Sequence, residues 1–164
     1  MTLTHVVGVD PGIIHTGVVR FLFDSSSRTV ALLHNVVFNA DAKAAAQWIS
    51  NLLPPSPMPT VYIEDYRPRS HFDTDRRMSE LIQELRLYLP RAEFLSNTGI
   101  KKVVKPELMQ LLDVWSFSTI THHQDLRSAA RIALLGMMKE EDTNRLLADI
   151  VRAHLEGDPW HVSS

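Results

Sequence analysis

The chain has 164 residues, of which 45% are hydrophobic and 22% charged, proportions typical of one globular domain with a sizeable core. The absence of cysteine excludes disulfides and thiol nucleophiles, and a formal net charge of -2 means that any binding of a polyanion must use local basic patches. No apolar stretch approaches the roughly 20 residues of a membrane helix and no signal peptide is evident, so we expect a cytoplasmic protein without membrane association.

The first part of the chain predicts three strands in an antiparallel meander. Two apolar runs rich in valine predict strands over residues 5–9 and 17–23. A turn-forming Asp-Ser-Ser-Ser sequence then leads into a third strand over residues 29–38.

A helical crossover is expected to extend this sheet. Residues 40–53 predict a helix with Asn39 as its N-cap, and residues 60–64, after a proline-rich connector, predict a buried strand. A strand that follows a helical crossover is expected to run parallel to the strand it joins. The C-terminal ends of the first and fourth strands are therefore expected to lie side by side, where open α/β sheets form their sites.

The second half predicts mainly helices. Residues 67–75 predict a polar, basic loop, and the helix expected over residues 75–89 either packs on the sheet or forms a dimer seam. A short strand over residues 92–95 and a short helix over 106–114 follow. Two further helices are expected over residues 121–138, where Thr121 and Gln124 match a capping box, and 143–155. Together these elements predict a single α/β domain over residues 1–164.

Three carboxylates are placed as a metal site requires. Asp10 ends the first apolar run and Glu64 the fourth, and a carboxylate at the mouth of a buried strand is costly unless something compensates it. Asp125 lies in the first turn of the helix over residues 121–138. Carboxylates suit Mg2+ or Mn2+, and three can hold two ions roughly 4 Å apart, a geometry suited to phosphodiester cleavage. Taken singly, each acid also fits a turn or a helix cap; the joint pattern favours the metal site.

Basic residues gather in three clusters: Arg67, Arg69, Arg76 and Arg77; Lys101, Lys102 and Lys105; and Arg127 with Arg131. Such clusters beside a metal site suit a nucleic acid. Tyr66, His71 and Phe72 interleave with the first cluster and are placed to stack on unpaired bases. An ordinary solvated face is the alternative, above all for the lysines.

Two histidines and two glycines accompany the acids. His122 lies three residues before Asp125, on the same helix face, and a neutral imidazole at a helix N-terminus suits a metal ligand. His123 is expected to be structural or to face nucleic acid, and an exposed helix start is the alternative for both histidines. Gly12 is expected to adopt a positive φ, and Gly17 to let a phosphate or a backbone approach closely.

These motifs in this order resemble the RuvC-like Holliday junction resolvases of the ribonuclease H-like superfamily: the segment 8–12 with Thr16 and Gly17, the segment 61–64, and the segment 122–125 leading into 127–130. The resemblance implies a ribonuclease H-like α/β fold with a five-stranded mixed sheet flanked by helices. It implies two Mg2+ ions per site, for which Mn2+ can substitute, and a homodimer that nicks opposed strands of a four-way DNA junction.

Carried over by position, the metal-binding and catalytic residues are Asp10, Glu64, Asp125 and His122, the last at a position that is acidic in some family members and histidine in others. Tyr66 or Phe72 would supply the aromatic that family members insert into the junction. The stretch 99–115 lacks the glycine-punctuated pattern of bacterial housekeeping members, which fits a divergent, phage-type enzyme.

We therefore expect a magnesium-dependent endonuclease that resolves Holliday junctions, leaving a 5′-phosphate and a 3′-hydroxyl. Its expected DNA-binding residues are Tyr66, Arg67, Arg69, Phe72, Arg76, Arg77, Lys101, Lys102, Lys105 and Arg127. A nuclease with broader targets, such as flaps, forks or RNA–DNA hybrids, and a non-catalytic junction-binding protein remain alternatives. A fragment of an actin-like ATPase is disfavoured, because that fold needs two such domains.

Overall fold

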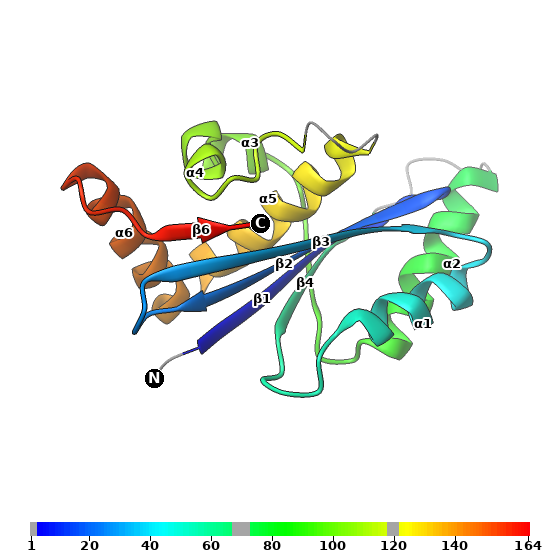
Figure 1. The fold of residues 1–164 in the computed structure, drawn as a ribbon. Coiled ribbons are helices and arrows are strands. Elements are labelled where there is room, and N and C mark those ends of the chain that lie inside the picture. Colours follow the sequence, from blue (N-terminus) through cyan, green and yellow to red (C-terminus); the bar gives the residue numbers. More distant parts are fainter. Residues whose placement is uncertain (1–2, 67–72, 118–121) are drawn as a thin grey trace.

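A computed structural model describes residues 3–66, 73–117 and 122–164 (Figure 1). The chain begins with three antiparallel strands, β1 (Leu3–Asp10), β2 (His15–Asp24) and β3 (Thr29–Phe38). This is the predicted meander, with β1 and β2 extending beyond their apolar centres. The register places Asp10 opposite Gly17.

The predicted crossover joins this meander to β4 (Thr60–Glu64), which runs parallel to β1 with Val9 opposite Ile63. It contains α1 (Ala42–Leu52), whose N-cap is Asp41 rather than the predicted Asn39. The Asp41 side chain accepts a hydrogen bond from the Ala44 amide at 2.7 Å, whereas the Asn39 side chain is turned back towards the loop after β1. The prediction of Asn39 was wrong because two polar cap formers lie close together at this helix start.

The remaining helices follow the predicted order. These are α2 (Asp73–Tyr88), α3 (Ile100–Val103), α4 (Pro106–Leu111), α5 (His123–Lys139) and α6 (Glu141–Leu155). The four-residue α3 was not predicted, and α4 ends before the predicted residue 114. The N-cap of α5 is His122, whose side chain makes no capping hydrogen bond. Thr121 of the predicted capping box lies outside the described residues.

The sheet has six strands rather than the predicted five, in the order β5-β4-β1-β2-β3-β6. The predicted fifth strand is β5 (Glu93–Leu95), which runs parallel to β4. The additional strand, β6 (His161–Ser163), runs parallel to β3 at its Thr29 end. Its three residues are too few to show an alternating pattern, which is why the sequence did not predict it.

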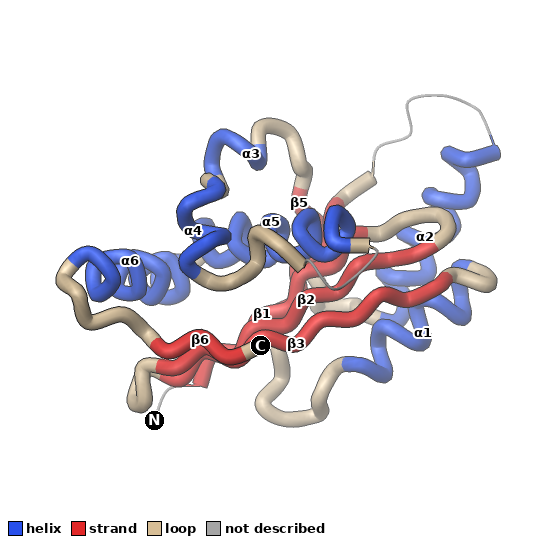
Figure 2. Tube along the Cα trace, turned by 45° about the horizontal axis from the view of Figure 1, so that its top comes forward, coloured by secondary structure: helices blue, strands red, loops and turns tan. Residues whose placement is uncertain are grey.

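Helices cover both faces of this mixed sheet (Figure 1), and an apolar core lies on each face. Helix α5 lies across β1 and β2 (Figure 2), and its predicted stripe is fully buried. On the other face α1 and α2 pack together, and the predicted apolar stripe of α2 is buried at Met78, Leu81, Ile82 and Leu85, whereas Leu87 is exposed. This apolar face of α2 therefore packs within the chain. None of the helices in the described ranges is long and apolar enough to cross a membrane.

Candidate metal centre

Asp10 and Glu64 meet at the C-terminal ends of the parallel strands β1 and β4, as predicted. Their side chains are hydrogen-bonded to each other. Burial and the neighbouring Glu64 carboxylate raise the pKa of Asp10 to about 8, and the charge of Asp125 adds to this effect. Burial also raises the pKa of Glu64. The charged forms of the two carboxylates are therefore disfavoured, because their charges repel in a partly desolvated site.

Two polar side chains hold these carboxylates in place. The amide of Asn97, just after β5, donates a hydrogen bond to Oε1 of Glu64. The Ser128 hydroxyl, one turn into α5, hydrogen-bonds to Asp10 and lowers its pKa, opposing the larger effects of burial and Glu64. Neither residue was predicted to belong to the site, because each reaches it only through tertiary packing. Such supporting bonds fix the orientation of a metal-binding carboxylate.

Asp125 reaches the same region because α5 packs unusually close to the sheet. A Cβ atom on Gly17 would lie 2.6 Å from the carbonyl oxygen of Asp125, and one on Gly8 would lie 1.9 Å from that of Ala129. Gly17 therefore allows the close backbone approach that was one of its two predicted roles. Gly12 does not have the predicted positive φ; it is needed because a Cβ there would lie 2.2 Å from the carbonyl oxygen of His15.

His15 is a member of the site that the sequence analysis missed. Its Nε2 atom lies 2.6 Å from Oδ2 of Asp125. The signal that could have found it is strand alternation: residues 15 and 17 point to the same face of β2, and Gly17 is the contact point of α5. From the sequence alone, a histidine at the edge of a turn does not show that it belongs to the site, because the position of α5 is not known.

His122 lies beside His15 and Asp125. Its Nδ1 atom is 3.8 Å from Oδ2 of Asp125, and its ring centroid is 4.1 Å from that of His15. The exposed ring of Phe38, at the end of β3, makes an edge contact with His122 at 5.5 Å between centroids. One possible ligand atom from each of His15, His122 and Asp125 lies within 4.8 Å of the others.

This donor set fits divalent metal ions. Asp10 and Glu64 offer hard oxygen ligands, whereas the second group offers two imidazoles and a carboxylate. In the described part of the chain, no lysine or arginine forms an ion pair with Asp10 or Glu64 to offset their charge. A bound cation would relieve the repulsion that raises the pKa of Asp10.

Only some of the predicted DNA-binding residues lie in the described part of the chain. Arg67, Arg69, His71 and Phe72 lie outside the described residues. The lysines of the second cluster, Lys101, Lys102 and Lys105, are exposed in and after α3. Arg76 and Arg77 are exposed on α2, where Arg76 lies 3.7 Å from Glu80. Tyr66 is half-buried against the core beneath α2.

The third basic cluster is shaped by an aromatic ring. The guanidinium carbon of Arg127 lies 4.4 Å from the ring centroid of Trp115, and that of Arg131 lies 5.5 Å from it. Both arginines are half-buried. Stacking of this kind reduces the freedom of the guanidinium groups, so that they form a fixed positive surface on the helix that carries Asp125.

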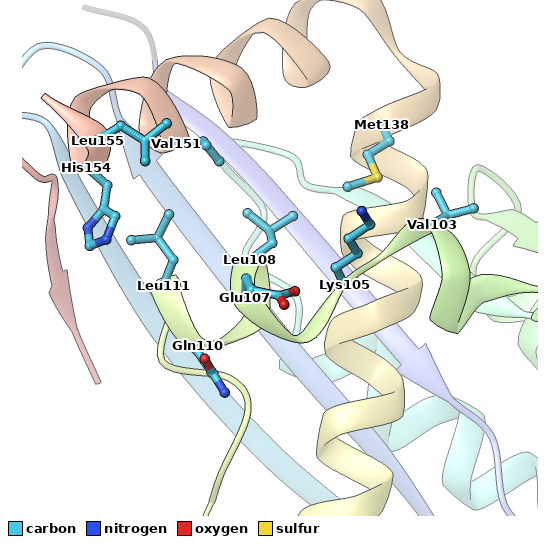
Figure 3. Close-up of a pocket in the computed structure, with 10 residues that line it drawn as sticks. All are labelled: Val103, Lys105, Glu107, Leu108, Gln110, Leu111, Met138, Val151, His154 and Leu155. Carbon is cyan, nitrogen blue, oxygen red and sulfur yellow. The ribbon is translucent and has the colours of Figure 1, made fainter.

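A cavity of about 850 Å³ lies apart from the candidate metal centre, between α4 and α6 (Figure 3). Its lining is largely apolar, with Leu108, Leu111 and Val151 facing one another and Lys105 at its side. None of the candidate metal ligands lines it.

The comparisons with known proteins bear on the fold. No protein-family model and no curated protein matches the sequence. T. thermophilus RuvC in complex with Holliday junction substrate superimposes with a TM-score of 0.60 and 17% identity, covering 80% of this chain and 91% of RuvC. A further structure of Thermus thermophilus RuvC gives a TM-score of 0.57 at 17% identity, with 80% and 92% covered.

The large terminase nuclease from thermophilic phage G20c is also similar, with a TM-score of 0.51 at 12% identity, covering 81% of this chain and 82% of that one. At these identities the likeness concerns the arrangement of the strands and helices. The chain has the ribonuclease H-like fold, which its motifs predicted and which it shares with RuvC.

Proposed function

We propose that the protein is a metal-dependent endonuclease that resolves four-way DNA junctions. The observation that carries the proposal is the meeting of Asp10 and Glu64 at the ends of β1 and β4, beside Asp125 and His122. T. thermophilus RuvC, which shares the fold, has been solved with a Holliday junction substrate. The ordered motifs of the sequence support the same activity.

Each ligand would have a distinct part in holding the metals. Asp10 and Glu64 would offer oxygen atoms to a cation, oriented by Ser128 and Asn97. Asp125 and His122 would hold a second ion. Divalent ions at these positions, Mg2+ or Mn2+, supply activation of a water molecule and stabilisation of the leaving oxygen of the phosphodiester.

The DNA surface is proposed to flank this centre. Lys101, Lys102 and Lys105 would contact phosphates, as would Arg127 on the helix that carries Asp125. Tyr66 is half-buried and follows Glu64 by two residues, so it would contact the DNA close to the carboxylates. The paired nicks of a resolvase require two such centres, so we propose a homodimer. Because the apolar face of α2 is buried within the protomer, the dimer seam must use another surface.

The test is cleavage of a labelled four-way junction, flap, fork and linear duplex in Mg2+ and in Mn2+, with Asp10→Asn as the control. We expect symmetric nicks in the junction that disappear in the variant. Cleavage of flaps and forks as well, again dependent on Asp10, would establish a broader branched-DNA nuclease. Tight junction binding without turnover in either metal would overturn the nuclease proposal in favour of a binding protein.

A further inference from the structure

His15 has no part in the function proposed above, although it lies inside the centre. We propose that His15 is a direct ligand of the second metal ion, which two imidazoles and one carboxylate would hold and which would be a first-row transition metal rather than Mg2+. This inference rests on the proposed function for the existence of the centre. It adds a ligand and a metal preference.

The spacing of the three donors suits a single ion. Ligand atoms at about 2.0–2.2 Å from one ion lie no more than about 4.4 Å apart. The Asp125 Oδ2 atom is 2.6 Å from Nε2 of His15 and 3.8 Å from Nδ1 of His122. A small adjustment of the side chains would therefore place one ion within reach of all three.

The His15 ring is held with one nitrogen towards these donors. His15 is opposite Phe38 in the β2–β3 pairing, and the centroids of their two rings are 6.2 Å apart. The Nδ1 atom of His15 is buried and has no hydrogen-bond partner within the described ranges. Only Nε2 is therefore directed at Asp125, and it contacts the same oxygen that His122 faces.

The two halves of the centre consequently differ in chemistry. The Asp10–Glu64 pair offers only oxygen atoms, which suit Mg2+, an ion that retains its water and prefers oxygen ligands. The group of His15, His122 and Asp125 offers two nitrogen atoms, and imidazole favours transition metals over Mg2+. One ion of each kind would then occupy the centre.

The experiment counts the nitrogen atoms bound to Mn2+. The 164-residue chain is labelled with [15N]histidine and loaded, without DNA, with substoichiometric Mn2+ in excess Mg2+. Pulsed EPR then measures how many histidine nitrogens are coupled to Mn2+. We expect two directly bound nitrogens in the unmodified protein and one in each of His15→Gln and His122→Gln. His34→Gln is the matched control: this half-buried histidine packs on Phe117 instead, and the variant should retain two.

A single nitrogen in the unmodified protein that persists in His15→Gln would overturn the inference, because His15 would then only orient Asp125 through a hydrogen bond. Mn2+ affinity should also fall by about tenfold or more in His15→Gln, with little change in Mg2+ affinity. The readout is independent of cleavage. Two nitrogens in a protein that cuts no DNA would leave the inference standing and reject the nuclease, whereas junction cleavage without the second nitrogen would reject the inference alone.

Discussion

Gly17 and Asp125 touch through their backbones, and this contact sets the position of the third carboxylate. A Cβ atom on Gly17 would lie 2.6 Å from the Asp125 carbonyl oxygen and 2.7 Å from its carbonyl carbon. The first turn of α5 therefore rests directly on β2, opposite Asp10 in the strand register. Because the obstacle is backbone rather than a flexible side chain, any larger residue at position 17 must push the helix away from the sheet.

Gly17→Ala is accordingly expected to displace Asp125 and to reduce cleavage by about tenfold or more, since a shift of about 1 Å in a catalytic group costs as much as roughly 100-fold in rate. The single-turnover rate on a four-way junction measures the effect. Gly136→Ala is the matched control, because a Cβ there would lie 2.3 Å from the Tyr62 ring, near the other end of α5. It should lower stability and retain activity below its melting temperature. Equal reductions of activity in two well-folded variants would contradict the role of Gly17.

The raised pKa of Asp10 predicts how the metal-free protein responds to pH. Between about pH 4 and pH 8 the folded protein binds more protons at Asp10 than the unfolded chain does, because the folded pKa is about 8 against an ordinary value of 3.8. The free energy of unfolding should therefore fall as pH rises through this range. Urea denaturation at a series of pH values, with a chelator present, measures the slope.

Asp10→Asn removes the titrating group. It should flatten this slope and raise the free energy of unfolding at about pH 8 by roughly 1–3 kcal/mol. Added divalent ions should flatten the slope of the unmodified protein, because a bound cation stabilises the ionised carboxylates. A slope that is the same in the variant and the unmodified protein would show that the carboxylate pair does not carry the effect.

The meeting of Asp10 and Glu64 could be predicted from the sequence because their positions follow from local patterns. Asp10 and Glu64 end apolar strands, and the parallel crossover brings such ends together without any knowledge of side-chain packing. The buried stripe of α5 likewise follows from its spacing. These elements depend on residues that are close in the chain, or on rules of connection that hold for most α/β sheets.

His15, Asn97 and Ser128 were missed because their places depend on how separate elements pack. Asn97 reaches Glu64 from the loop after β5, and Ser128 reaches Asp10 from α5. The strand β6 was missed for a related reason: its pairing with β3 depends on the return of the chain after α6. Local pattern carries no information about such distances.

His122 and His123 are adjacent in sequence but differ in environment, which gives a sharp comparison. His122 faces His15 and Asp125 at the centre, so His122→Ala should lower the cleavage rate by about tenfold or more. His123→Ala keeps the same helix start and should have a much smaller effect. Rates at saturating metal and junction measure both. A larger reduction in His123→Ala would contradict the placement of His122 among the ligands.

The lysines around α3 provide the test of the DNA surface. Each lysine that neutralises a phosphate releases counterions, so the slope of log K against log salt should become shallower by about 0.9 for each phosphate that is no longer neutralised. Replacing Lys101, Lys102 and Lys105 with alanine should therefore weaken junction binding at low salt and flatten its salt dependence.

The matched control for this test replaces Arg145 and Arg152 on α6. Arg145 is paired with Glu141 and Arg152 with Asp149, so their charges are already locally compensated. If both sets of variants change the slope equally per charge removed, binding responds to net charge alone and the lysines form an ordinary solvated face. A selective effect of the lysine variants would place the nucleic acid along α3, on the side of the sheet from which α5 presents Asp125.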